Sequence, residues 1–143
     1  MDFAYNQTLG FLPSLYLRGT SVGFNYSRAY ATVRRGGLAP HRVSGRLGYS
    51  YRRFNGSFGV IWASDRPDGG TYGRYFSEST KYDLTLNWNL NKWATLFVQG
   101  RNISNVKDRW YESPPGVEQG KQGHLRAMEE YGANWNFGVR GGF

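Results

Sequence analysis

Cysteine is absent from this chain of 143 residues. Its absence excludes disulfides, thiolate chemistry and cysteine-based metal sites. Long hydrophobic runs are absent as well, because the mean hydropathy is −0.63 and no stretch approaches the roughly 20 apolar residues of a transmembrane helix. No stripe of apolar residues at helical spacing is long enough to predict an amphipathic helix. These absences favour strands over helices.

Residues suited to catalysis are sparse. The two histidines, His41 and His124, lie far apart in the sequence, and neither has the partner four residues away that a zinc-binding helix needs. Glu129 and Glu130 are adjacent, so on a strand they would point to opposite faces and could not form an acid–base pair. No phosphate-binding loop or Ser-His-Asp arrangement occurs. We therefore expect no enzyme activity, no cofactor, and no catalytic, cofactor-binding or metal-ligating residues.

Aromatic residues and glycines are plentiful instead. Aromatics make up 17% of the chain, which also holds 20 glycines. This much aromatic surface argues against disorder, which needs low hydrophobicity. Many aromatics at low mean hydropathy are typical of membrane strands, in which only alternate residues meet lipid.

The clearest alternation covers residues 131–143. One face would carry mostly aromatic and aliphatic residues, namely Tyr131, Ala133, Trp135, Phe137, Val139, Gly141 and Phe143. The other face would carry small and polar residues, namely Gly132, Asn134, Asn136, Gly138, Arg140 and Gly142. A period of two predicts a strand, and this strand would have lipid on one side and a polar lumen on the other.

Six earlier segments alternate in the same way. They cover residues 3–9, 21–27, 43–52, 58–62, 82–90 and 93–101. The segment 93–101 is apolar on both faces near its middle, which leaves its lipid-facing side open. We predict an all-β, antiparallel up-and-down meander of about seven strands.

Short and long connections alternate along the chain. The short ones lie around Leu12-Pro13-Ser14, at Phe54-Asn55-Gly56-Ser57, which is an Asn-Gly hairpin signal, and at residues 89–92. The long ones are residues 30–40, 64–79 and 105–128. This is the pattern of an outer-membrane barrel with tight periplasmic turns and longer extracellular loops. Such a barrel must be exported. Because Met1-Asp2-Phe3-Ala4-Tyr5 lacks the start of a signal peptide, we expect a piece of a longer protein.

The stretch from Lys81 to Phe143 resembles the end of TonB-dependent outer-membrane receptors. The resemblance rests on Tyr82-Asp83-Leu84, on Asn102-Ile103-Ser104-Asn105, on Tyr131-Gly132 and on Gly138-Val139-Arg140-Gly141-Gly142-Phe143. Upstream, Leu12-Pro13 and Gly23-Phe24-Asn25-Tyr26-Ser27 look like an earlier hairpin of the same barrel. In that family an Asn-(Leu/Ile)-x-Asn element commonly ends the penultimate strand, and an aromatic residue ends the protein.

The resemblance implies a fragment of a transmembrane β-barrel of about 22 strands, occluded in the whole receptor by an N-terminal plug. Such receptors take up a scarce ligand, such as a siderophore complex, cobalamin or a glycan, and TonB with ExbB and ExbD supplies the energy. Residues 1–143 would be the C-terminal part of the barrel, without plug or earlier strands. Seven strands are too few to close, since bacterial single-chain barrels have even strand numbers from about 8 upward. We expect no transport by this chain alone.

The resemblance also implies partners in the outer membrane. They are membrane lipid and lipopolysaccharide, the barrel-assembly machinery, the remainder of the receptor, and the TonB system through the missing plug; nucleic acid is not among them. The terminal strand would be the signal for barrel assembly, carried by Tyr131, Trp135, Phe137, Val139 and Phe143. It would at the same time be an ordinary closing strand.

Other aromatic and basic residues have candidate roles. Tyrosines and tryptophans near strand ends predict an interfacial girdle. The rival interpretation is a stacking platform for bases or sugars. The residues concerned are Tyr49, Tyr51, Trp62, Trp88, Trp93 and Trp135. Residues on presumed extracellular loops could contact a ligand or lipopolysaccharide phosphates, or could simply be solvated; they are Arg34, Arg35, Tyr72, Tyr75, Arg109, Trp110 and Tyr111.

The charge leaves a second hypothesis open. The net charge is +8, which by itself is compatible with a small autonomous β-sheet module that binds nucleic acid or a glycan. The basic residues are dispersed, however, rather than gathered on one stripe. A chain that stays soluble, monomeric and folded without detergent would favour this alternative.

Overall fold

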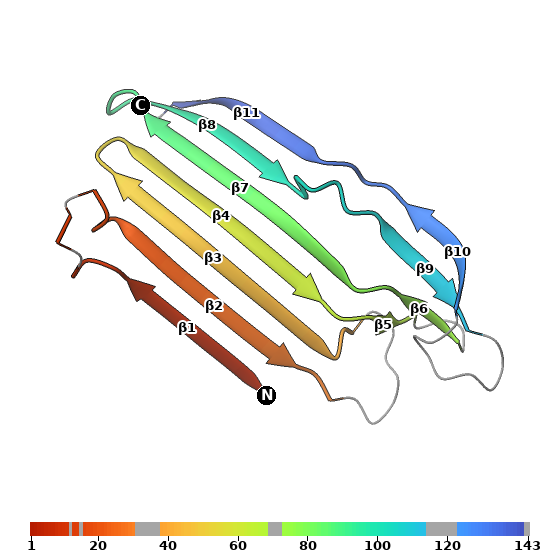
Figure 1. The fold of residues 1–143 in the computed structure, drawn as a ribbon. Coiled ribbons are helices and arrows are strands. Elements are labelled where there is room, and N and C mark those ends of the chain that lie inside the picture. Colours follow the sequence, from red (N-terminus) through yellow and green to blue (C-terminus); the bar gives the residue numbers. More distant parts are fainter. Residues whose placement is uncertain (12, 15, 31–37, 69–72, 114–122, 142–143) are drawn as a thin grey trace.

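The computed structural model describes the chain except for residues 12, 15, 31–37, 69–72, 114–122 and 142–143. The described residues form eleven strands in two antiparallel sheets (Figure 1). The larger sheet contains β1 (Asp2–Thr8), β2 (Thr20–Arg28), β3 (His41–Tyr51), β4 (Phe54–Ala63), β7 (Ser79–Asn89), β8 (Ala94–Arg101) and β11 (Asn134–Gly141). The smaller sheet contains β5 (Arg66–Pro67), β6 (Arg74–Phe76), β9 (Asp108–Glu112) and β10 (His124–Glu129).

The larger sheet confirms the predicted all-β meander. Its strand order, β1-β2-β3-β4-β7-β8-β11, follows the chain, and every neighbouring pair is antiparallel. Each of the seven segments marked by alternation contributes one strand. No helix occurs among the described residues, and so none there is long and apolar enough to cross a membrane.

The connections lie at opposite ends of the larger sheet (Figure 1). Residues 9–19, 52–53 and 90–93 join strands at one end, which we call the short-turn end, and β11 also runs to this end. The connections from β2 to β3, from β4 to β7 and from β8 to β11 lie at the other end, the long-connection end. The predicted alternation of short and long connections is present from β3 onward, but the connection of residues 9–19 was expected to be short and is about as long as the connection of residues 29–40.

The predicted Asn-Gly turn is wrong. Tyr51 pairs with Phe54, so the turn between β3 and β4 consists of Arg52 and Arg53, and Asn55 and Gly56 belong to β4. Arg52 adopts the positive φ of 51° that the tight turn requires. A Cβ on Gly56 would lie 3.2 Å from atoms of the Phe54 ring and of Leu86. Gly56 therefore makes room for that packing instead of forming the turn.

The connections of residues 64–79 and 105–128 are more ordered than we expected. The first contains β5 and β6 and the second contains β9 and β10, all predicted as loop. Strands β6 and β9 pair with each other, so the two connections form one sheet, β10-β9-β6-β5, at the long-connection end. Strands of two to six residues that pair across distant connections leave too little periodicity to be recognised in the sequence.

The terminal strand is shorter than the alternation of residues 131–143 predicted. Strand β11 begins at Asn134, and Tyr131 lies in the link from β10 to β11. In that link Gly132 has a φ of +71°, which breaks an extended strand. Trp135, Phe137 and Val139 do alternate within β11, whereas Phe143 lies outside the described residues.

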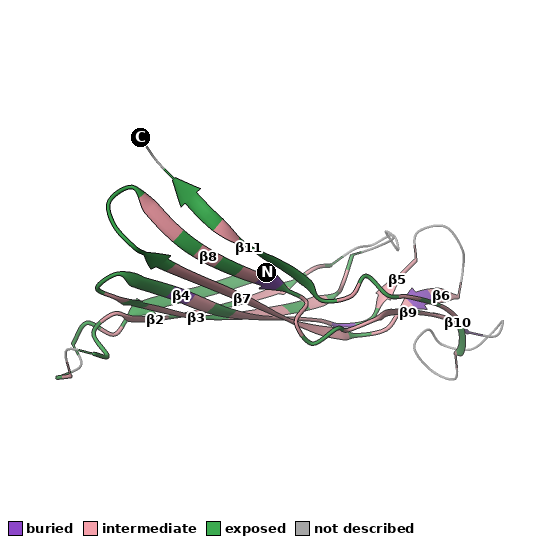
Figure 2. Ribbon diagram, turned by 90° about the horizontal axis from the view of Figure 1, so that it is seen from above, coloured by how far each residue is buried: buried purple, intermediate pink, exposed green. Residues whose placement is uncertain are grey.

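The larger sheet is one curved layer, and no other described strand packs on either of its faces (Figure 2). Tyr75 of the small sheet is the one buried hydrophobic residue in the described part of the chain. The register also decides the open question about β8: Leu96 and Val98 pair with Val139 and Phe137 and so share the apolar face. Phe97 lies on the opposite face, beside Gly138.

Candidate functional site

One face of the larger sheet is apolar from β1 to β11. The cross-strand register places Val22, Leu47, Phe58 and Leu84 side by side in one row, and Leu86, Val98 and Phe137 in the next row. Most of these side chains are exposed, Leu47 by 49% and Phe137 by 78%, whereas Leu84 and Leu86 are half-buried between their neighbours. Soluble monomers rarely expose a continuous apolar patch of more than a few hundred Å². This face therefore needs an apolar environment.

The strand lengths suit a bilayer. Strands β3 and β7 have 11 residues each and β4 has 10. At about 3.3 Å per residue and a tilt of about 40°, strands of this length cover a depth of roughly 25 Å, the height of the apolar band of membrane barrels. Leu84 is the central residue of β7 and would lie at mid-depth.

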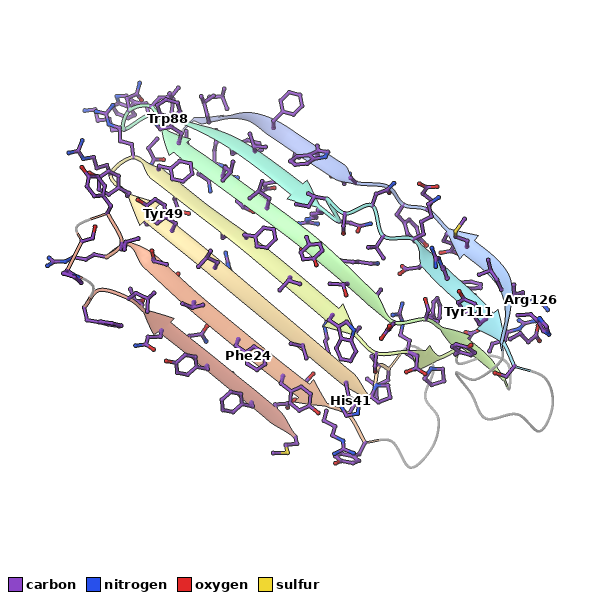
Figure 3. All side chains as sticks on the ribbon, in the orientation of Figure 1. Phe24, His41, Tyr49, Trp88, Tyr111 and Arg126 are labelled. Atoms are coloured by element: carbon purple, nitrogen blue, oxygen red, sulfur yellow. The ribbon has the colours of Figure 1, made fainter. Side chains whose placement is uncertain are left out.

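Aromatic residues gather at the short-turn end of the apolar face. Tyr51, Phe54 and Trp88 form one row across β3, β4 and β7, and Figure 3 shows Trp88 and Tyr49 at this end. Trp88 is 56% exposed. This arrangement supports the predicted girdle.

The remaining girdle candidates are distributed more widely. Trp93 directly precedes β8 and is exposed, and Trp62 pairs with Val43 and Thr80 toward the long-connection end. Trp135 is the second residue of β11 and packs over Gly100, where an added Cβ would lie 2.8 Å from its ring. Trp62 and Trp135 thus lie on the apolar face, but Trp135 shares the row of Gly100 and Leu84 and does not lie at the short-turn end.

The other face of the larger sheet is polar and hollowed. A cavity of about 500 Å³ opens on it, with Asn6, Asn25, Ser44, Arg46, Ser57, Asp83, Thr85, Gln99 and Arg101 among the lining residues. Arg46 donates a hydrogen bond to Ser57 Oγ at 3.2 Å. Because the hollow is on this face, the sheet curves with its polar side inward, as the lumen side of a barrel wall would.

The small sheet contains all four of the loop candidates that the structure describes, namely Tyr75, Arg109, Trp110 and Tyr111. Tyr75 stacks on Tyr111 with ring centroids 5.6 Å apart, and Phe76 meets Trp110 edge-on at 5.0 Å. The Arg66 guanidinium lies 4.4 Å from the centre of the Phe76 ring. Burial raises the pKa of the Tyr75 hydroxyl, and the nearby Tyr111 and Asp65 add to this.

An ion-pair cluster borders these rings. Glu112 accepts a hydrogen bond from Arg126 and lies 3.6 Å from Arg74 Nε. The hydrogen bond from Arg126 is the main reason why the pKa of the Glu112 carboxyl is lowered, and the charges of both arginines act in the same direction. Figure 3 shows Tyr111 and Arg126 together on this sheet, far from Trp88.

Three buried polar atoms at the small sheet have no hydrogen-bond partner in the described structure. They are Arg74 Nε, which has only the longer ion-pair contact with Glu112, Trp110 Nε1 and Ser113 Oγ, and Ser113 is only 6% exposed. Buried donors normally find a partner. The small sheet therefore has unused hydrogen-bonding capacity next to its aromatic cluster.

The Asn102-Ile103-Ser104-Asn105 motif connects the two sheets. The Asn102 side chain donates to the carbonyl oxygen of Val106 and accepts from its N–H, both at 3.0 Å, and it reaches Gly132 O at 3.4 Å. The backbone N–H of Asn102 donates to Asp83 Oδ1 at 3.0 Å. Asn102 has a φ of 50°, a conformation that asparagine tolerates better than most residues. The motif has a structural role at the point where β8 ends.

The structure brings some of the predicted loop residues together and leaves others unplaced. Tyr75, Trp110 and Tyr111 join one cluster, and Arg109 lies beside them on β9. Arg34, Arg35 and Tyr72 lie outside the described residues. Phe76, Glu112 and Arg126 also belong to this site and were not predicted from the sequence. Residues 109–112, Arg-Trp-Tyr-Glu, show no polar–apolar alternation that could have predicted strand β9.

The two histidines lie in different sheets. His41 begins β3 and shares a hydrogen bond of 2.8 Å with the Tyr26 hydroxyl through Nδ1, and His124 begins β10. Across the described ranges, no group of three or more His, Asp or Glu side chains could hold a metal ion.

Comparison with protein families, with curated proteins and with solved structures finds no match for this chain. Its function must therefore be argued from its own residues and geometry.

Proposed function

We propose that this chain forms part of the wall of a transmembrane β-barrel in a bacterial outer membrane. The observation that carries the proposal is the division of the larger sheet into an exposed apolar face and a hollowed polar face. Lipid would cover the apolar face, and the polar face would line the lumen. A tyrosine- and tryptophan-rich row at the short-turn end supports a position at the membrane–water interface.

The distribution of charge and aromatic rings disfavours the alternative, a nucleic-acid-binding sheet. Proteins that bind single-stranded nucleic acid combine basic residues with stacking rings in one groove. Here Arg42, Arg46 and Arg101 lie on the polar face, whereas Phe24 and Phe58 lie on the opposite face of the same strands. A strand of nucleic acid could not contact both sets at once.

A receptor of the TonB-dependent kind is the more specific proposal. It rests on the resemblance of residues 81–143 and on the meander with long connections at one end. In such a receptor the small sheet would face the exterior, where its aromatic cluster and the unpartnered Trp110 Nε1 and Ser113 Oγ could contact a ligand. Strands β1 and β11, which each pair with one neighbour here, would join the other strands of the barrel.

Folding with and without a membrane mimetic tests the proposal. The chain is refolded in buffer alone and in phosphatidylcholine vesicles, and secondary structure, oligomeric state and vesicle co-flotation are measured. We expect β structure and co-flotation only with lipid, and aggregation in buffer because the apolar face is uncovered. A folded soluble monomer in buffer would refute the membrane proposal and favour the autonomous module.

A further inference from the structure

Charge is distributed unevenly between the two ends of the larger sheet. The short-turn end, residues 9–19, 49–55, 88–95 and 139–143, contains Arg18, Arg52, Arg53, Lys92 and Arg140 and no Asp or Glu. All ten acidic residues lie elsewhere in the sequence. In the folded chain the described residues of these segments lie at one end of one sheet. The charged side chains of these segments are therefore all cationic.

A hollow on this end joins two of the cations to aromatic rings. It has a volume of about 600 Å³ and is lined by Tyr51, Arg52, Arg53, Phe54 and Trp88. The three aromatic residues form the last row of the apolar face, and the two arginines are the turn next to it. The hollow thus has an apolar wall continuous with the proposed lipid-facing surface and a cationic rim.

The arginines are held at this rim by their own contacts. Arg53 Nη1 donates to Leu90 O at 2.9 Å, which ties the β3–β4 turn to the β7–β8 turn and leaves other N–H groups of the guanidinium available. The Arg52 guanidinium lies 5.3 Å from the centre of the Tyr51 ring. Both residues are exposed. Neither forms an ion pair within the part of the chain that the structure describes, so both can donate to an anion.

We propose that this hollow binds the phosphate headgroup of an anionic phospholipid in the membrane leaflet at the short-turn end. The inference rests on the proposed membrane function. Guanidinium groups form charge-assisted, bidentate hydrogen bonds with phosphate, and the Phe54 and Trp88 rings would contact the glycerol and the first part of the acyl chains. Charge complementarity selects this occupant over a neutral lipid.

Local quenching of tryptophan fluorescence tests the proposal. The chain is bound to mixed vesicles of phosphatidylcholine and phosphatidylglycerol in which only one of the two lipids carries brominated acyl chains. The quenching that a Trp88→Phe variant loses is assigned to Trp88. Each cation near an anionic surface strengthens binding about fivefold. We therefore expect a preference of about 25-fold for phosphatidylglycerol at Trp88.

Matched variants separate the site from general charge attraction. The Arg52→Gln/Arg53→Gln variant should lose the preference while quenching by brominated phosphatidylcholine persists. Arg28→Gln/Arg42→Gln removes the same charge from the long-connection end and should retain the preference. Equal quenching by both lipids in the wild-type chain, or an equal loss of the phosphatidylglycerol preference in both variants, would overturn the headgroup site. Either result would leave the membrane proposal standing.

Two further outcomes are decisive. Preferential quenching that inorganic phosphate abolishes would show a site for free anions and would overturn the assignment to a lipid. If neither brominated lipid quenches Trp88, the chain does not place this end in a bilayer. That result would refute the membrane proposal and the headgroup site together.

Discussion

An arginine at Leu84 tests whether lipid covers the apolar face. Leu84 is five residues from either end of β7, and its register partners on the same face are Phe58 and Gly100. Five residues correspond to about 17 Å along the strand and to about 13 Å in depth at a tilt of about 40°. Leu84 would therefore lie near the middle of the hydrocarbon layer, from which its side chain could not reach water easily.

The expected cost follows from this depth. Arginine on the lipid face of a membrane barrel costs about 2–4 kcal/mol at the midplane. For Leu84→Arg this predicts a vesicle affinity lower by roughly 30-fold to 900-fold. On a surface covered by water the same change would alter stability by about 0.5 kcal/mol, as most exposed substitutions do.

Thr85→Arg is the matched control. Thr85 follows Leu84 on β7 but lines the polar hollow, where it pairs with Ser57 and Gln99. Flotation with phosphatidylcholine vesicles, quantified over a range of lipid concentrations, measures the affinity of both variants. We expect a large loss for Leu84→Arg and little change for Thr85→Arg. Equal effects in the two variants would mean that lipid does not distinguish the two faces.

Three further predictions concern the junction, the sheet packing and the small sheet. Asn102→Ala removes three side-chain hydrogen bonds at a residue with a positive φ. It should lower the free energy of unfolding by urea, measured in vesicles, by about 2 kcal/mol. An unchanged midpoint of urea unfolding would show that the junction contributes nothing to stability. Gly100→Ala places a Cβ 2.6 Å from Ile103 and 2.8 Å from Trp135. It should shift the fluorescence emission of Trp135, which is identified by comparison with a Trp135→Phe variant, and lower the free energy of unfolding by about 1 kcal/mol. Identical emission spectra for Gly100→Ala and the wild-type chain would contradict this packing. Because the folded pKa of Glu112 is lowered by Arg126, its contribution to the small sheet is present above the ordinary value of 4.5 and is lost as pH falls through the lowered pKa. Emission of the neighbouring Trp110 should report this acid transition, and a Glu112→Gln variant that keeps the same transition would exclude Glu112 as its source.

The larger sheet was predictable because its physics is local. An alternation of apolar and polar residues fixes which way each side chain points, and seven such segments specify seven strands. The turn at Arg52 and Arg53 was not predictable in this way. There the row formed by Tyr51, Phe54 and Trp88 sets the register, and it outweighs the Asn-Gly turn preference of residues 55–56.

The small sheet was predicted only as separate loop residues. Tyr75 and Tyr111 are 36 positions apart in the chain, and they meet because β6 pairs with β9. No periodicity in either segment encodes that pairing. The side of β8 that faces the apolar environment was undecidable for a related reason, since Leu96, Phe97 and Val98 are all apolar and only their neighbours on β11 distinguish them.

The pairing of β6 with β9 has a consequence for how this end of the molecule can change. The β4–β7 and β8–β11 connections depend on each other structurally, because each supplies two of the four strands of the small sheet. A new binding specificity transplanted through one connection alone would leave the other without its hydrogen-bonding partner. These two segments therefore form a single exchangeable cassette, and a chimera that carries both should retain the aromatic cluster.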